Sequence, residues 1–118
     1  MRNNICISFY LRCKRIYIHQ STLDELNNPM FVGFLISNDR KTFLIQARTK
    51  KDFHSVRLRV DKIGKTDNAE ISSDGLCQTL ARLNDWDLNC SYRVYGRAFP
   101  EQRIAVFDFS SSEIINDE

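Results

Sequence analysis

Two short stretches decide the fold of this chain: Thr22-Leu23-Asp24-Glu25-Leu26-Asn27-Asn28 and Thr79-Leu80-Ala81-Arg82-Leu83-Asn84-Asp85. Both follow the pattern T-L-x-x-L-N-[N/D], and each stands ahead of a segment that predicts a β-hairpin. A strand, a short helix and a hairpin bury too little apolar surface to be stable alone. We therefore expect two such units to complete one another within one domain.

The first unit is predicted from the alternation of apolar residues around the first stretch. Residues 5–11 alternate as a strand does, and residues 16–18 resume the pattern as a second strand or a bent continuation of the first. Ser21 or Thr22 is expected to cap a short helix, which Asn27-Asn28-Pro29 ends. Residues 31–37 and 42–47 then predict a hairpin.

Between the two units, residues 55–61 alternate as a strand, and residues 61–70 are polar and predict a connector between the two halves. The second unit then repeats the order of helix and hairpin. Ser73 or Asp74 is expected to cap a helix over residues 75–83. Residues 92–99 and 103–109 predict the second hairpin.

The sequence therefore predicts an α+β fold in which two strand-helix-hairpin repeats form one compact, mainly antiparallel β-sheet or barrel-like domain with two short helices. The repeats cover about residues 14–48 and 69–109, within a single domain at residues 1–112, and we expect residues 113–118 to be a frayed acidic tail. The chain of 118 residues, 42% of them hydrophobic, is long enough for one such core.

Charge is distributed unevenly along the chain, although the formal net charge is only +2. Residues 40–65 hold nine Lys or Arg against two Asp, whereas residues 66–118 hold four Arg against ten Asp or Glu. The basic segment is predicted to bind nucleic acid, or a protein partner with an acidic surface. A solvated strand face that discourages edge pairing is the alternative.

Candidate binding residues come from this segment and from the aromatic strand at residues 92–99. Alternation predicts that Arg57 and Arg59 share one face of a strand, about 6 to 7 Å apart, which is close to the phosphate spacing along one nucleic-acid strand. Tyrosine and arginine are the side chains that most often anchor protein interfaces. The predicted binding residues are Arg40, Lys41, Arg48, Lys50, Lys51, Arg57, Arg59, Tyr95 and Arg97.

Catalytic and metal-binding patterns are missing from the sequence. It has no P-loop, G-x-G-x-x-G, G-x-S-x-G or H-E-x-x-H motif. Its four cysteines form no C-x-x-C pair, and neither histidine stands near them at zinc-ligand spacing. We therefore expect no enzyme activity, no metal and no cofactor; a hydrolase that uses Cys13 and His19 is the catalytic alternative.

Two resemblances bear on function. The order of strand, short helix and hairpin in residues 14–48 and 69–109 resembles the AbrB-type swapped-hairpin barrel, although His19 stands where that family has a proline. The resemblance implies a DNA-binding transcription regulator. Four segments, Phe9-Tyr10-Leu11-Arg12, Thr22 to Pro29, Trp86-Asp87 and Tyr92 to Gly96, look like small phage or mobile-element proteins of Gram-positive bacteria, among them anti-CRISPR inhibitors that bind a Cas effector directly.

We accordingly expect a non-enzymatic binding protein that inhibits a host nucleic-acid-handling machine, with an AbrB-like regulator as the alternative. Its partner would be a Cas effector or the nucleic acid of that effector, and the chain would be a monomer or a homodimer. Residues 1–11 are too short and too polar for a signal peptide or a membrane span, so we expect it in the cytoplasm of the bacterial host cell, with free thiols.

Overall fold

A computed structural model describes residues 5–48, 55–57, 59–60 and 69–115, and for residues 55–57 and 59–60 it describes the backbone only. The first part of the chain contains β1 (Ile5–Tyr10), a 3-10 helix (Leu11–Cys13), β2 (Arg15–Ile18), α1 (Gln20–Glu25), β3 (Phe31–Ile36) and β4 (Thr42–Arg48). The rest contains β5 (Ser55–Arg57), β6 (Arg59–Val60), β7 (Ala69–Ser72), α2 (Asp74–Asn84), β8 (Ser91–Phe99) and β9 (Ile104–Ile115).

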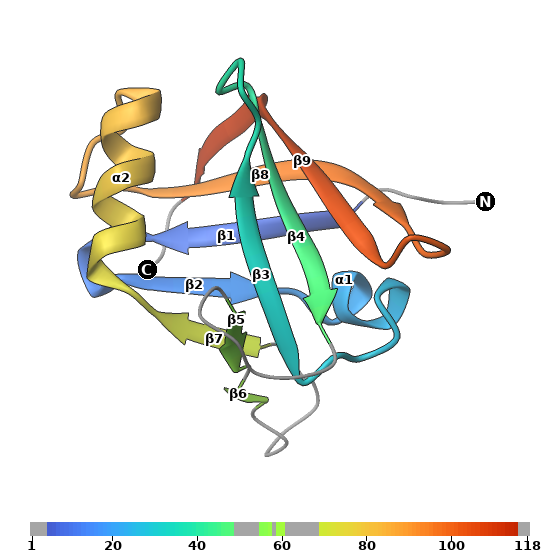
Figure 1. Cartoon of the computed structure of the whole chain (residues 1–118). Coiled ribbons are helices and arrows are strands. Elements are labelled where there is room, and N and C mark those ends of the chain that lie inside the picture. Colours follow the sequence, from blue (N-terminus) through green and yellow to red (C-terminus); the bar gives the residue numbers. More distant parts are fainter. Residues whose placement is uncertain (1–4, 49–54, 58, 61–68, 116–118) are drawn as a thin grey trace.

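The described strands form one sheet in the order β5-β3-β4-β9-β8-β1-β2-β7-β6, and all neighbours are antiparallel. Its first and last strands, β5 and β6, are separated in the sequence by residue 58 alone. Residues 55–60 therefore connect the two ends of the sheet, because β5 pairs with β3 and β6 pairs with β7. Figure 1 shows the resulting curl, in which β3 and β4 cross β1 and β2 at a steep angle. The predicted α+β, barrel-like fold is confirmed.

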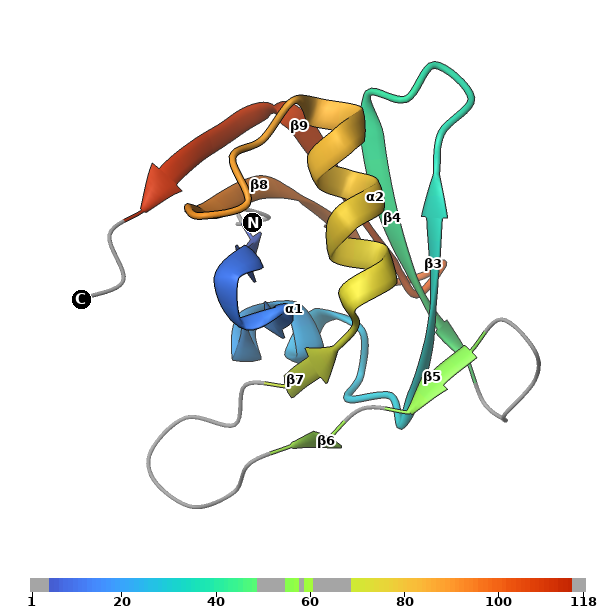
Figure 2. The ribbon, with the colours of Figure 1, turned by 90° about the vertical axis from the view of Figure 1, so that its left-hand side faces the viewer.

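The order of strand, helix and hairpin occurs twice, as β2-α1-β3-β4 and as β7-α2-β8-β9. Strands in equivalent places pair with each other, β2 with β7 and β4 with β9. Figure 2 shows α2 packed alongside the curled strands and α1 below it. Each unit thus completes the sheet of the other, which is the physical reason that two were expected.

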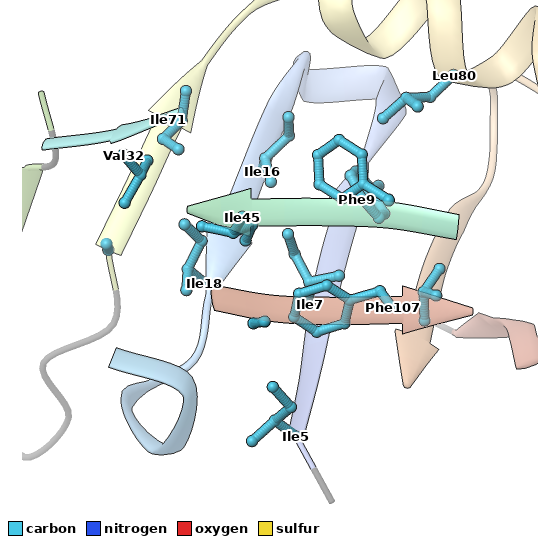
Figure 3. Packing of buried hydrophobic residues seen from close by; sticks show 14 of the residues in the cluster. Ile5, Ile7, Phe9, Ile16, Ile18, Val32, Ile45, Ile71, Leu80 and Phe107 are labelled. Atoms are coloured by element: carbon cyan, nitrogen blue, oxygen red, sulfur yellow. The ribbon is translucent and has the colours of Figure 1, made fainter. Parts of the chain in front are cut away.

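The core lies between the two halves of the curled sheet. Phe9, Phe43 and Phe107 are its largest fully buried side chains. Figure 3 shows Ile7 and Ile45 close to Phe9 and Phe107. Because these residues alternate along β1, β4 and β9, only one side of each strand enters the core. Full burial of such a side chain stabilises the folded protein by about 1.5–3 kcal/mol. This energy keeps these side chains inside, and the alternate residues of each strand therefore face outward.

The two helices begin differently. Ser73 caps α2 as predicted, and its Oγ accepts a hydrogen bond from the Leu76 amide at 3.2 Å. The N-cap of α1 is His19, so the predicted cap at Ser21 or Thr22 is wrong. Thr22 is fully buried inside the helix, where its hydroxyl donates to the Cys6 carbonyl of β1. The Thr22 hydroxyl makes this tertiary hydrogen bond and so does not cap the helix as the local sequence had suggested.

Three boundaries differ from the prediction. β7 lies partly in the expected connector, because Ala69 and Glu70 pair with β2. β9 continues to Ile115, so residues 113–115 form a strand rather than part of a frayed tail; residues 116–118 lie outside the described part. The strand expected at residues 55–61 is described as the two short strands β5 and β6.

Candidate binding face

Tyrosine and arginine side chains gather on the outer side of β2, β1 and β8, three strands that lie side by side (Figure 1). Since Ile7 and Phe9 point into the core, Ser8 and Tyr10 of β1 point outward. The register places Ser8 opposite Tyr17 on β2 and opposite Arg93 on β8. We call the outward set the tyrosine–arginine face; it comprises Tyr10, Arg15, Tyr17, Arg93, Tyr95 and Arg97.

One end of this face holds a pocket of about 340 Å³ lined by Tyr10, Cys13, Arg15 and Tyr17. The rings of Tyr10 and Tyr17 meet edge to face, with their centroids 5.1 Å apart. Arg15 forms an ion pair with Glu70 of β7, and its side chain remains about half exposed. The ion pair holds the guanidinium in place beside the two rings, where it can still reach a ligand.

The middle of the face is organised by hydrogen bonds around Tyr95. The Tyr95 hydroxyl donates to Glu113 Oε2 at 2.5 Å, and it also bonds with the Arg93 side chain. Its backbone amide donates to Ser111 Oγ at 2.9 Å. The bond to Glu113 raises the pKa of Tyr95, since it favours the protonated phenol. The Tyr95 ring, 38% exposed, is therefore held in one orientation at the surface.

A serine and a histidine meet beneath the face. Ser8 Oγ and His19 Nε2 are 2.9 Å apart, and Ser8 is fully buried. Burial lowers the pKa of His19, and the nearby charge of Arg93 lowers it further, so the ring is neutral at pH 7. A nucleophile must reach its substrate, and a serine with no exposed surface does not. The pair therefore supports the sheet rather than catalysis.

The Cys13–His19 pair gains no support from the geometry. Cys13 is exposed in the turn before β2, and His19 follows the other end of that strand. The length of β2 alone separates them by about 10 Å, and the His19 ring bonds to Ser8 instead.

Among the predicted binding residues, Tyr95 and Arg97 are exposed neighbours on one side of β8. Arg40 and Lys41 lie at the turn between β3 and β4, whereas Arg48 ends β4, about 20 Å away along the strand. The basic segment is thus not a single cluster in its described part. The reason is that β4 runs through the middle of it and carries its two ends apart.

Carboxylates accompany the cations at the β3–β4 turn. Asp39 accepts hydrogen bonds from Ser37 Oγ and from the Lys41 amide, and these bonds, with the charge of Lys41, lower the pKa of Asp39. Asp108 of β9 lies near the same lysine; hydrogen bonds from the amide and hydroxyl of Ser110 lower the pKa of Asp108, and the charge of Lys41 lowers it further. The turn is therefore of mixed charge rather than basic.

The remaining predicted residues are only partly described. Lys50 and Lys51 lie outside the described residues. The backbone register places Arg57 opposite Phe31, and Arg59 opposite Glu70. Whether their guanidinium groups form a phosphate-spaced pair stays a prediction.

Four residues of the face were missing from the predicted binding residues: Tyr10, Arg15, Tyr17 and Arg93. Their outward alternation on residues 5–11, 15–18 and 92–99 could have been read from the sequence. That β1 lies between β2 and β8 could not, because this pairing joins segments far apart in the chain.

Within the described ranges, no three His, Cys, Asp or Glu side chains come together in a way that could hold a metal ion. The four cysteines are free thiols, and Cys77 is buried. No helix in the described part of the chain is both long and apolar enough to cross a membrane. No protein-family model, curated protein or solved structure was found to match the chain.

Proposed function

We propose that this chain is a non-enzymatic binding protein of a phage or mobile element that inhibits a nucleic-acid-handling machine of its host by direct contact. The tyrosine–arginine face is the proposed contact surface. The observation that carries the proposal is the gathering of three tyrosines and three arginines on the outer side of three adjacent strands. Such side chains dominate binding energy at protein interfaces when a rigid scaffold presents them.

The rigidity of the face supports this function. Tyr95 is fixed by Glu113 and Arg93, Arg15 is fixed by Glu70, and Tyr10 packs on Tyr17. Side chains that are already ordered lose little conformational entropy on binding. The class of partner comes from the resemblance to phage proteins, among them anti-CRISPR inhibitors, and a Cas effector is the first partner to test.

The experiment is a titration of purified Cas effector nucleases with this protein, with target cleavage as the readout. We expect cleavage to fall to zero near one equivalent, since an inhibitor that works by occupancy acts stoichiometrically. The double variant Tyr95→Ala/Arg97→Ala should need at least tenfold more protein. Arg82→Ala, at an exposed arginine of α2, is the matched control and should inhibit as the parent protein does. Full cleavage with every effector, with and without guide RNA, would refute the proposal.

A DNA-binding regulator of AbrB type is the second candidate. The observation that favours it is the double strand-helix-hairpin order, with β2 paired to β7 and β4 paired to β9. In this case duplex DNA should bind with an affinity that falls steeply with salt. Arg57→Ala/Arg59→Ala should weaken a gel shift, and an unchanged shift would remove these two residues from the DNA contact.

A further inference from the structure

The pocket at the end of the tyrosine–arginine face has a chemistry of its own. Two half-buried aromatic rings form one part of it, and the guanidinium of Arg15 forms another. Its volume of about 340 Å³ lies at the lower end of the range of small-ligand sites, about 300–1,000 Å³. A flat ring system that stacks on or against a tyrosine is the kind of group such a pocket accommodates.

The turn that borders the pocket is positively charged. Arg12 and Lys14 flank Cys13, a pocket-lining residue, and both are exposed. With Arg15 they supply three cations, while Glu70 is the carboxylate bonded to Arg15. The surplus of positive charge favours an anionic ligand, and its position beside aromatic rings favours an anion that carries a flat ring.

We propose that this pocket binds single-stranded nucleic acid, with one unpaired base against Tyr10 and Tyr17 and the flanking phosphates on Arg12, Lys14 and Arg15. Aromatic rings combined with a basic border are the general means by which proteins hold single strands without reading their sequence. A base within a duplex is stacked on its neighbours and cannot enter the pocket. The inference deepens the proposed function, since it assigns a ligand to one end of the same face, where the guide RNA or displaced strand of an inhibited machine would bind.

The binding test uses fluorescence anisotropy with a fluorescein-labelled 12-mer of mixed sequence, as RNA, as DNA and as the matching DNA duplex. Single strands should bind at least tenfold more tightly than the duplex. Base stacking on aromatic rings accounts for about 5- to 150-fold in affinity per base. Tyr10→Leu/Tyr17→Leu should weaken binding by that factor, and Tyr10→Phe/Tyr17→Phe should retain it because phenylalanine also stacks. If the Phe and Leu double variants lost affinity equally, base stacking on Tyr10 and Tyr17 would be refuted.

The charge test measures how affinity depends on salt. Each phosphate contact adds about 0.7 to the slope of log affinity against log salt concentration for a single strand. Arg12→Gln/Lys14→Gln should therefore lower the slope by about 1.4, while Arg82→Gln on α2 should leave it unchanged. A slope that does not differ between the two variants would overturn the phosphate contacts.

A third measurement locates the ligand with the parent protein alone. Cys13 lines the pocket and is exposed, so iodoacetamide should modify it, while the buried Cys77 serves as an internal reference. Saturating oligonucleotide should slow modification of Cys13, read by mass spectrometry of its peptide, and leave Cys77 unmodified. Unchanged modification of Cys13 at saturation would place the oligonucleotide elsewhere and overturn the proposal. Competition by a poly-glutamate peptide as effective as that by the oligonucleotide would instead identify an acidic protein as the ligand.

These results separate the pocket from the proposed inhibitor function. If oligonucleotides bind through Tyr10 and Tyr17 but no effector is inhibited, the pocket stands and the inhibitor function fails. If an effector is inhibited through Tyr95 and Arg97 but oligonucleotides do not bind, the reverse holds.

Discussion

Replacement of Gly96 by alanine tests how closely β8 and β9 approach beneath the tyrosine–arginine face. A methyl group at Gly96 would overlap the Val106 carbonyl oxygen and would stand 2.7 Å from the Phe107 Cα and 2.8 Å from the Val106 carbonyl carbon. All three are backbone atoms of the neighbouring strand, so no side-chain rotation relieves the contact. Overpacking of this kind costs about 1–3 kcal/mol, and we expect Gly96→Ala to lie at the upper end, about 3 kcal/mol.

Two other glycines provide matched controls. At Gly33 the nearest atom to an added methyl is Arg48 Nε at 2.6 Å, on a flexible side chain that can move, so Gly33→Ala should cost no more than about 1 kcal/mol. At Gly75, in the first turn of α2, nothing lies within 4 Å. Gly75→Ala should stabilise the protein by about 0.4–1 kcal/mol, since alanine restricts the unfolded chain.

The assay is urea denaturation followed by the fluorescence of Trp86, the single tryptophan, which stacks on Tyr92 and packs against Phe9. With a typical slope of about 1–3 kcal/mol per molar urea, a loss of 3 kcal/mol lowers the midpoint by about 1–3 M. From most to least stable, the expected order is Gly75→Ala, the parent protein, Gly33→Ala and Gly96→Ala. Because Gly96 lies between Tyr95 and Arg97, its variant should also weaken partner binding. A Gly96→Ala midpoint within 0.3 M (an experimental margin of about 0.5 kcal/mol) of the parent would refute the close approach of β8 and β9.

Three further predictions concern stability. Ser73→Ala should cost about 1 kcal/mol in urea denaturation, because the bond to the Leu76 amide is lost; Ser73→Asp, which keeps the cap, should cost less. The pKa of His19 is lowered by burial and by Arg93, so stability should fall as pH decreases below about 6.5, the unfolded value, and His19→Gln should remove that part of the pH dependence in thermal melts. Burial raises the pKa of Cys77 from 9.0 to about 11, so stability should fall as the pH rises from 9 to 11, by at most about 3 kcal/mol. A Cys77→Ala variant with the same alkaline loss would contradict this assignment.

The hairpins were predictable because their information is local. The first was expected at residues 31–37 and 42–47 and is found at Phe31–Ile36 and Thr42–Arg48. β7 was not predicted, since only Ala69 and Ile71 of its four residues are apolar. Its conformation comes from pairing with β2, more than fifty residues earlier in the sequence, and no local pattern carries that information.

The tyrosine–arginine face was predictable only in part for the same reason. Tyr95 and Arg97 belong to one strand, and alternation alone places them together. Tyr10 and Tyr17 join them only because β1 inserts between β8 and β2. The basic segment was misjudged in the opposite way: Lys41 and Arg48 are near in sequence, but a single extended strand separates them.

The repeated architecture shows which positions the two units have in common. The pair beside the first hairpin turn is Ile36–Phe43, and the pair beside the second is Phe99–Ile104. If the two hairpins are matched by their inward positions, Ile36–Phe43 corresponds to the next pair along, Ala98–Ala105, and Ile45 of β4 corresponds to Phe107 of β9. Both of these are fully buried, so the inward positions share one role in the two units.

The outward positions do not share one role in the two units. By the same correspondence Arg97 is matched by Leu35, and Tyr95 by Gly33. Core residues of both units must fill one shared interior, and they are restricted by it, whereas outward residues have no such restriction. Both units are needed to form the curled sheet, whereas the six residues of the tyrosine–arginine face lie together on the outer side of β2, β1 and β8. The shared core therefore accounts for the similarity of the inward positions, and the outward positions of β3 and β8 differ because that core does not restrict them.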